Sequence, residues 1–283
     1  YFSYCTKLTR LEIPTNITSF GLKSFSGCTS LIYIKIPSSV TEIVSESFEW
    51  CSSLKEIVIP SSVDSFGIDV FKKCTDLEQV IFDTPSQITR FRDKMFDGCE
   101  SLKRVVLPSF FTRLYDAMFL KCRFLSKIEI PSLNEKINLK CENLPEGELI
   151  IPDSVTSIGY SAFANCRGFN SLKLSNNLVS INMSAFYSCS GMKGELIIPD
   201  SVTSIESNAF GGCEGFDSLT LSNNLTSIND NAFYMCSGLK GELILPDSVT
   251  SIGEYSFYCC AGLDSLKLSD KIQEIPDNVF YGC

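Results

Sequence analysis

Apolar and polar positions along the chain repeat with a period of about 23 residues. Each unit opens on Leu-x-x-Ile-x-Ile-Pro, as at Leu54–Pro60, and closes on Phe-x-x-Cys, as at Phe48–Cys51. Apolar residues at positions 4 and 6 of the opening segment show the alternation of a half-buried strand. The proline that follows has no N–H to donate and ends the strand. The pattern therefore predicts one short strand in each unit.

The rest of each unit predicts a turn back to the core. An apolar pair such as Val155 and Ile158 indicates a second short extended piece, and the Ala162–Phe163 step indicates an extended or helical turn on the opposite, convex side. One unit is too small to bury its own apolar face, whereas stacked units bury a continuous core. We expect a right-handed superhelix, mostly β with little α, whose parallel sheet forms the concave face.

The repeat predicts a single solenoid over residues 1–283, with about twelve coils of 23–24 residues and twelve strands in one curved sheet, from 8–13 to 263–268. From residue 149 the sequence repeats in double units of 47 residues. The coil at 122–147 is irregular, which indicates either a bend in one solenoid or a domain boundary. Because both ends fall inside a coil, we expect the chain to be a fragment of a longer protein.

The repeat resembles a known family in its most regular segments. IPDSVTSIG at 151–159 and AFANC at 162–166, with their counterparts throughout the chain, resemble the BspA-type (Treponema pallidum type) leucine-rich repeats of surface proteins. The resemblance implies a leucine-rich-repeat solenoid and a cell-surface or secreted protein. It also implies adhesion or binding to protein or glycan partners, including host extracellular or cell-surface proteins.

Thirteen of the 14 cysteines fall in the repeat frame, and only Cys259 stands outside it. A column of parallel, inward-pointing side chains is badly oriented for bridging, although neighbouring Cα atoms would lie close enough. We expect a buried, reduced ladder of small side chains. Cys259 is either a reactive thiol or a tolerated substitution at an outward position. The frame cysteines are Cys5, Cys28, Cys51, Cys74, Cys99, Cys122, Cys141, Cys166, Cys189, Cys213, Cys236, Cys260 and Cys283.

Catalytic chemistry finds little support in the composition. The chain has no histidine, which excludes His-dependent nucleophile activation and His-ligated zinc. The recurrent acids lie two coils apart, roughly 9.6 Å, and are better explained as turn residues than as a catalytic or calcium-binding pair. We expect no enzyme activity, no cofactor and no metal. These acids are Glu148, Glu195, Glu242, Asp153, Asp200 and Asp247.

The net charge of −9 argues against nucleic acid as a partner, because a phosphate backbone requires a basic surface. The imbalance is local: residues 1–141 hold 18 basic and 16 acidic residues, whereas residues 142–283 hold 6 and 17. No run of about 20 apolar residues is present to span a membrane. We expect a monomer whose partners are proteins or glycans.

Binding residues are expected at positions 3 and 5 of the Leu-x-x-Ile-x-Ile strand, which face the open side of the sheet. These positions vary between coils in the first half of the chain and alternate in the second. Val58, Ile81 and Val106 should form an exposed apolar strip, a feature typical of interaction sites. The expected partner-binding residues are Tyr33, Lys35, Glu56, Val58, Gln79, Ile81, Arg104, Val106 and Lys127.

Two alternatives remain beside the binding function. One is that the apolar residues at position 5 are present only because β-branched side chains favour strands. The other is a rigid spacer or stalk that presents another domain, a role that would suit the duplicated second half of the chain.

Overall fold

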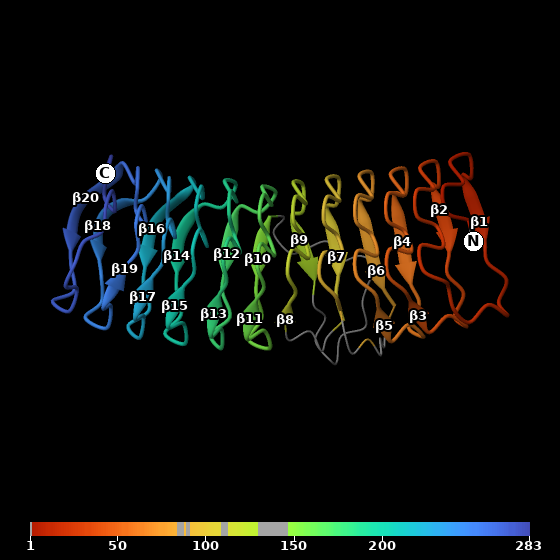
Figure 1. Cartoon of the computed structure of the whole chain (residues 1–283), viewed down its shortest axis with the longest axis horizontal. Coiled ribbons are helices and arrows are strands. Elements are labelled where there is room, and N and C mark those ends of the chain that lie inside the picture. Colours follow the sequence, from red (N-terminus) through yellow and green to blue (C-terminus); the bar gives the residue numbers. More distant parts are fainter. Residues whose placement is uncertain (1, 84–87, 89–90, 109–112, 130–146) are drawn as a thin grey trace. The chain divides into compact units, whose positions relative to one another are not determined.

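A computed structural model describes residues 2–83, 88, 91–108, 113–129 and 147–283. Within these residues the chain is a parallel β-solenoid without helices, as predicted (Figure 1). It divides into two compact units, which we call unit 1 (1–111 and 117–146) and unit 2 (112–116 and 147–283). The single-solenoid organisation of 1–283 stays a prediction, and most of the irregular coil lies outside the described residues. No described helix is long and apolar enough to cross a membrane.

Twelve main strands lie where the Leu-x-x-Ile-x-Ile pattern predicts them, and every pairing among them is parallel. Most are shorter than predicted, because the residue at position 1 belongs to the preceding turn, as where the Leu54 N–H donates to the Cys51 carbonyl at 3.1 Å. The main strands are β1 (Arg10–Glu12), β2 (Tyr33–Lys35), β4 (Glu56–Ile59), β6 (Gln79–Phe82), β7 (Arg104–Val106), β9 (Lys127–Glu129), β10 (Glu148–Ile150), β12 (Ser171–Lys173), β14 (Gly194–Ile197), β16 (Phe216–Thr220), β18 (Lys240–Ile244) and β20 (Gly262–Lys267). Exceptions are β16 and β20, which include their first residues, Phe216 and Leu263.

The prediction of one continuous main sheet is wrong. The main strands pair as β1-β2 and β4-β6-β7-β9 in unit 1, and as β10-β12, β14-β16 and β18-β20 in unit 2. In unit 2 the breaks follow the 47-residue double repeat. β14 and β18 contain Gly194 and Gly241, which take φ of 80° and 76° and shift the register by one residue. These register shifts lie within the β14–β16 and β18–β20 pairs, so they do not by themselves account for the breaks before β14 and β18.

In eight coils of the described part of the chain, the second extended piece forms a minor strand of two residues, also in parallel pairing. In unit 2 these strands build a sheet of six, in the order β19-β17-β15-β13-β11-β8, and in unit 1 β3 pairs with β5. The minor strands are β3 (Glu42–Ile43), β5 (Ser65–Phe66), β8 (Arg113–Leu114), β11 (Ser157–Ile158), β13 (Ser180–Ile181), β15 (Ser204–Ile205), β17 (Ser227–Ile228) and β19 (Ser251–Ile252).

The segment around each Phe-x-x-Cys is an extended turn and not a helical one, and we call it the Phe–Cys turn. The residues two before and two after the phenylalanine take positive φ, as Glu46 and Trp50 do at 57° and 62°. The backbone between them bonds to the next coil, where the Phe48 N–H donates to Val70 O at 3.0 Å and the Trp50 N–H to Lys72 O at 2.9 Å. The turns therefore form a third ladder between coils.

The core of each unit contains a column of stacked phenylalanine rings. Neighbouring rings lie 5.1–5.8 Å apart between centroids and are inclined by 5–15°. Leucine and isoleucine side chains of the main strands fill the remaining interior, and most are fully buried. The columns are Phe2, Phe25, Phe48, Phe71, Phe96 and Phe119 in unit 1, and Phe163, Phe186, Phe210, Phe233, Phe257 and Phe280 in unit 2.

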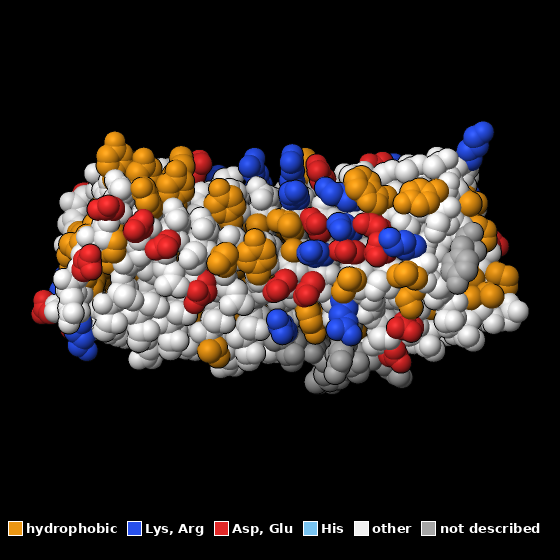
Figure 2. Space-filling model, viewed as in Figure 1, with side chains coloured by type: hydrophobic (Ala, Val, Ile, Leu, Met, Phe, Trp, Pro, Cys, Tyr) orange, Lys and Arg blue, Asp and Glu red, His pale blue; other side chains and the backbone are white. Residues whose placement is uncertain are grey.

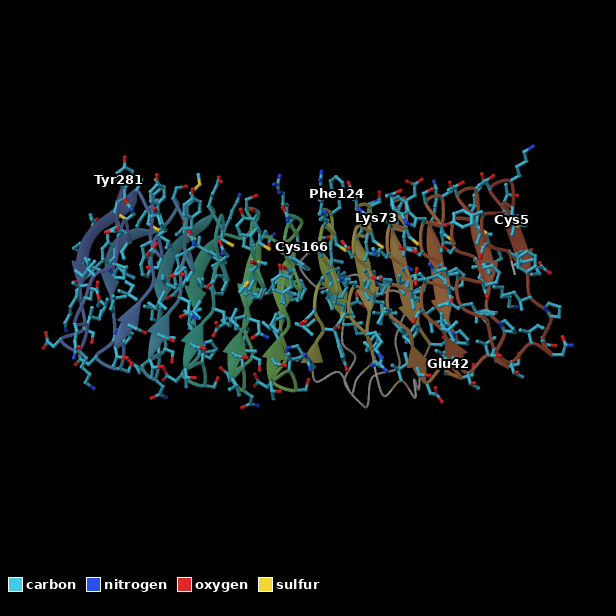
Figure 3. All side chains as sticks on the ribbon, viewed as in Figure 1. Cys5, Glu42, Lys73, Phe124, Cys166 and Tyr281 are labelled. Carbon is cyan, nitrogen blue, oxygen red and sulfur yellow. The ribbon has the colours of Figure 1, made fainter. Side chains whose placement is uncertain are left out.

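The cysteine ladder is confirmed, since every described cysteine is free and the frame cysteines from Cys28 to Cys260 are buried (Figure 3). Cys141 lies outside the described residues. The thiols do more than fill space: the Cys51 Sγ–H donates to Phe25 O in the preceding coil at 3.1 Å. Cys74, Cys189 and Cys236 make the same bond to Phe48, Phe163 and Phe210 at 3.1–3.2 Å. Each thiol thus satisfies a buried carbonyl group of its neighbour.

Thiol counting tests the ladder directly. In the native protein at pH 8, a thiol reagent is expected to modify Cys5, Cys283 and the half-buried Cys259 quickly, because the other described thiols are buried. After denaturation without reductant, nearly all 14 cysteines should react. Recovery of two free thiols or of none would mean six or seven disulfides and would exclude the ladder.

The buried thiols also predict how stability depends on pH. Burial raises the pKa of Cys213 and of Cys260 to about 12, above that of a thiol in the unfolded chain, about 8.5. Above pH 8.5 the unfolded chain therefore loses protons that the folded chain keeps, and the free energy of unfolding should fall by up to about 1.4 kcal/mol per thiol per pH unit. Urea unfolding of the wild type and of a Cys213→Ser, Cys260→Ser variant between pH 8 and 10 measures this slope.

The serine variant is the control, because its hydroxyl groups can donate to the same carbonyl groups without titrating in this range. The decrease of its free energy of unfolding with pH should be shallower, by about the contribution of two thiols. Equal slopes for the two proteins would contradict a stabilising role for the neutral thiols.

Candidate functional site

The candidate site is the open face of the main strands in unit 1. Pairing places the predicted positions in straight columns, with Arg10 opposite Tyr33 and Glu12 opposite Lys35. Val58, Ile81 and Val106 likewise lie side by side on β4, β6 and β7. The predicted register is therefore confirmed within each of these two sheets.

A hollow of about 1220 Å³ lies over β1, β2 and β4. Four of the predicted binding residues line it: Tyr33, Lys35, Glu56 and Val58. Tyr33 is 41% exposed and Val58 42%, which leaves both side chains open to a partner. The guanidinium of Arg10 lies 5.2 Å from the Tyr33 ring centroid, a cation–π contact that holds both side chains at the floor of the hollow.

The walls of the hollow carry both signs of charge. Arg10, Lys35 and Lys55 are basic, and Glu12, Glu56 and Asp83 are acidic. Ile13, Ile32, Ile36, Pro37 and Pro60 add apolar surface. A concave surface with mixed charges around apolar and aromatic side chains suits the recognition of a polar partner.

The prediction of an exposed apolar strip is wrong for two of its three residues. Ile81 is 7% exposed and Val106 only 1%, so both are withdrawn from solvent and cannot serve as contacts. Neither lines the hollow. The side chains of Arg104, Lys127 and Glu129 on the same face are also largely buried. Sequence position gave the direction of these side chains but not their exposure.

Arg104 and Lys127 are held by a buried carboxylate. The Arg104 guanidinium donates to both oxygens of Glu129, at 3.1 and 2.8 Å, and Lys127 Nζ lies 3.0 Å from Glu129 Oε1. Burial alone would raise the pKa of the Glu129 carboxyl, but the hydrogen bonds from Arg104 and Lys127 hold it below its ordinary value. Gln79 lies half-buried beside Arg104. These predicted site residues therefore stabilise the face and lie apart from the hollow.

Sequence analysis missed the contribution of position 2. Thr9, Ile32 and Lys55 precede their strands by one residue and line the hollow beside positions 3 and 5. All three occupy position 2 of the repeat, but strict alternation of side chains along a strand assigns that position to the opposite face of the sheet. Asp83 was missed because it occupies the position of the proline that ends other main strands.

Among the recurrent acids, Asp153 and Asp200 act as turn residues, as predicted, whereas Glu148, Glu195 and Glu242 lie within the main strands β10, β14 and β18. Asp153 accepts hydrogen bonds from the backbone N–H of Asn176 at 2.8 Å and from its side-chain amide at 3.3 Å. These bonds lower the pKa of Asp153. Asp200 accepts the equivalent bonds from Asn223. Among the described residues, no group of three Asp, Glu, Cys or His side chains could hold a metal ion.

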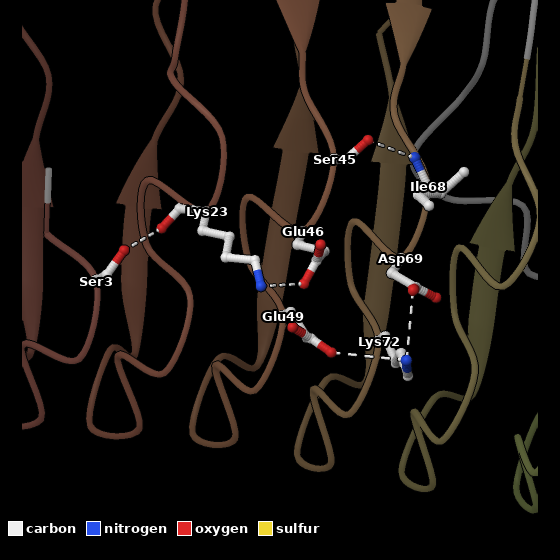
Figure 4. A network of polar contacts seen from close by, with 8 residues as sticks. All are labelled: Ser3, Lys23, Ser45, Glu46, Glu49, Ile68, Asp69 and Lys72. Atoms are coloured by element: carbon white, nitrogen blue, oxygen red, sulfur yellow. Dashed lines mark hydrogen bonds and ion pairs between the residues drawn. The ribbon is translucent and has the colours of Figure 1, made fainter.

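The Phe–Cys turns of unit 1 carry charges that neutralise one another (Figure 4). Lys23 Nζ lies 2.8 Å from Glu46, and Lys72 Nζ lies 3.7 Å from Glu49 and 3.3 Å from Asp69. Burial, followed by the hydrogen bond with Glu46, raises the pKa of Glu49, whereas the hydrogen bond from Lys23 lowers the pKa of Glu46. This network links three successive coils and leaves little net charge for an outside partner.

Comparisons with known proteins agree with this architecture. A leucine-rich-repeat protein from Bacteroides ovatus is 28% identical with a TM-score of 0.62, over 99% of this chain and 78% of that one. The T. pallidum leucine-rich-repeat protein is 26% identical with a TM-score of 0.51, over 74% of this chain and 78% of that one. A leucine-rich-repeat protein from Eubacterium ventriosum shares the fold at 21% identity and a TM-score of 0.52, over 97% and 82% of the two chains.

A search of curated proteins found no match. The sequence does match the family described as BspA type leucine rich repeat region (6 copies), at residues 1–125, 140–240 and 192–283. These segments cover nearly the whole chain. The protein therefore belongs to the BspA-type leucine-rich-repeat family.

Proposed function

We propose that this chain is a non-catalytic binding module of a cell-surface or secreted protein, and that it holds a protein or glycan partner in the hollow of unit 1. The hollow carries the proposal: it combines an exposed tyrosine and valine with six charged side chains on a face whose backbone is fixed by strand pairing. Buried aromatic and arginine anchors dominate binding energy in measured interfaces. Arg10 and Tyr33 supply such a pair.

Variation between coils supports a specific partner. Along β1, β2 and β4 the third strand position changes from Arg10 to Tyr33 to Glu56, and the fifth from Glu12 to Lys35 to Val58. The scaffold underneath keeps its leucine, isoleucine, phenylalanine and cysteine positions. A constant backbone that displays different side chains provides specificity without altering the fold.

A spacer is the second candidate, and the main strands of unit 2 favour it. The second pair of coils displays nearly the same residues as the first. Position 3 carries Glu195, Ser218, Glu242 and Ser265, and position 5 carries Ile197, Thr220, Ile244 and Lys267. Low diversity of this kind follows from duplication and requires no partner. The two roles are separable, because each resides in a different unit.

A binding experiment on the hollow tests the first role. The wild type is screened against arrays of glycans and of extracellular protein domains, and each hit is titrated with a Tyr33→Ala, Val58→Ser variant. Loss of an aromatic anchor and its apolar neighbour should weaken binding by about 30-fold or more, the effect of a typical hot spot. Both side chains are largely exposed, so a thermal melt should show little change.

The matched control is Ile197→Ser, which removes a similarly exposed side chain at the fifth strand position of unit 2. It should leave every affinity unchanged. Equal affinities for the wild type and the folded hollow variant, or an array without a single hit, would reject the binding role and favour the spacer.

A further inference from the structure

A second candidate interaction surface lies on the Phe–Cys turns of the last coils of unit 2. Its side chains differ in character from the charged network of unit 1. A tyrosine directly follows the core phenylalanine at Tyr234, Tyr258 and Tyr281. The three rings stack in a column, with centroid distances of 5.1 Å and interplanar angles of 13° and 10°. Hydrogen bonds from the Met235 N–H to Tyr258 O and from the Cys259 N–H to Tyr281 O, both 2.7 Å, fix their spacing.

The same turns carry three acidic residues, four positions before the tyrosines. Asp230, Glu254 and Asp277 each lie three residues before the core phenylalanine, and all three are exposed. The Asp230 carboxylate accepts a hydrogen bond from the Glu254 N–H at 3.0 Å, which holds these two residues in register. We call these six residues the Tyr–acid ridge. Figure 2 shows hydrophobic side chains gathered along this edge at the C-terminal end, where Figure 3 labels Tyr281.

Residues 147–283 of unit 2 are all described. Within them, the carboxylates of Asp230, Glu254 and Asp277 make no ion pair. Residues 226–283 contain eight acidic side chains and only three lysines, Lys240, Lys267 and Lys271. The turns of unit 1 show the contrary arrangement, in which Lys23 and Lys72 neutralise Glu46, Glu49 and Asp69. In unit 1 the paired charges lie two residues before and one residue after the phenylalanine, whereas the unpaired acids of unit 2 lie three residues before it.

We propose that the Tyr–acid ridge binds an arginine-rich segment of a partner protein. Carboxylates accept bidentate hydrogen bonds from guanidinium groups, and phenol oxygens accept further ones. The apolar edges of the stacked rings cover the methylene groups of the arginine side chains. The neighbouring Met235, 42% exposed, extends the apolar surface.

Other occupants fit the ridge less well. A glycan would stack on the faces of aromatic rings, but Tyr258 has both faces covered by Tyr234 and Tyr281. A second copy of this chain would bring one acidic surface against another, which is unfavourable at moderate ionic strength. The charge and the hydrogen-bond acceptors therefore both select a cationic peptide.

The test uses the full chain and fluorescent peptides of nine arginines, nine lysines or nine glutamates at about 50 mM salt, where exposed charges are only partly screened. The arginine peptide should bind, more tightly than the lysine peptide, and the glutamate peptide should not. A ridge variant with Asp230→Asn, Glu254→Gln and Asp277→Asn should lose about tenfold or more in affinity for the arginine peptide. These changes keep side-chain shape and acceptor oxygens.

The matched control removes the same three charges elsewhere in unit 2, at the exposed Glu242→Gln, Asp264→Asn and Asp270→Asn. Its affinity should fall by no more than about threefold, since only long-range attraction is lost. Equal losses of affinity in the ridge and control variants would show that only the net charge of the protein matters, and would overturn the proposal. The absence of binding by the wild type would overturn it as well.

A second variant, Tyr234→Phe with Tyr258→Phe, keeps the stacked rings and removes two phenol oxygens. The arginine peptide should lose its advantage over the lysine peptide, because the planar guanidinium can bind a carboxylate with two N–H groups and still donate to a phenol oxygen. An unchanged preference would overturn the role of the tyrosines. Sedimentation of the wild type should show a monomer, and a dimer abolished by the ridge variant would assign the ridge to self-association instead.

Discussion

The stacking of each Phe–Cys turn on the next is the interaction on which the rest of this structure depends. The turns are the part of the coil where backbone hydrogen bonds, ring stacking and the thiol bond act together between the same two neighbours. The Phe48 N–H bonds to Val70 O, the Phe48 and Phe71 rings lie 5.4 Å apart, and the Cys74 thiol donates to Phe48 O. Main strands of three to six residues give no comparable continuity, since their ladders are interrupted. A coil is therefore positioned by its turn.

This arrangement frees two surfaces to vary. The main strands need only their inward leucine and isoleucine residues, so β1, β2 and β4 can display the side chains of the hollow. The turns need only phenylalanine, cysteine and two left-handed residues, so the position after the phenylalanine can carry Glu49 and Lys72 in one unit and tyrosines in the other. Function in such a repeat depends on side chains that the fold does not require.

Sequence analysis predicted the strands, their register and the cysteine ladder, because each follows from a local pattern that recurs in every coil. It failed where a property depends on the surroundings of a residue. Ile81 and Val106 point as the alternation requires, yet their burial depends on what covers the face. The left-handed turns were invisible because Glu46 and Trp50, unlike glycine, carry no signal for positive φ. The tyrosines after Phe233 and Phe257 are a visible pattern, but they lie outside the strands on which the predicted binding columns were based.

Residue-resolved hydrogen exchange under native conditions tests the central role of the turns most directly. Within unit 2, the amides of Phe186 and Phe210 bond to the next coil at 2.8 Å, whereas β14 and β18 begin new sheets at Gly194 and Lys240. Turn amides should exchange only through opening of the whole unit, and at least about tenfold more slowly than amides of β14 and β18 at the sheet breaks. Faster exchange at Phe186 and Phe210 than in β14 and β18 would show that the main strands, and not the turns, hold the coils together.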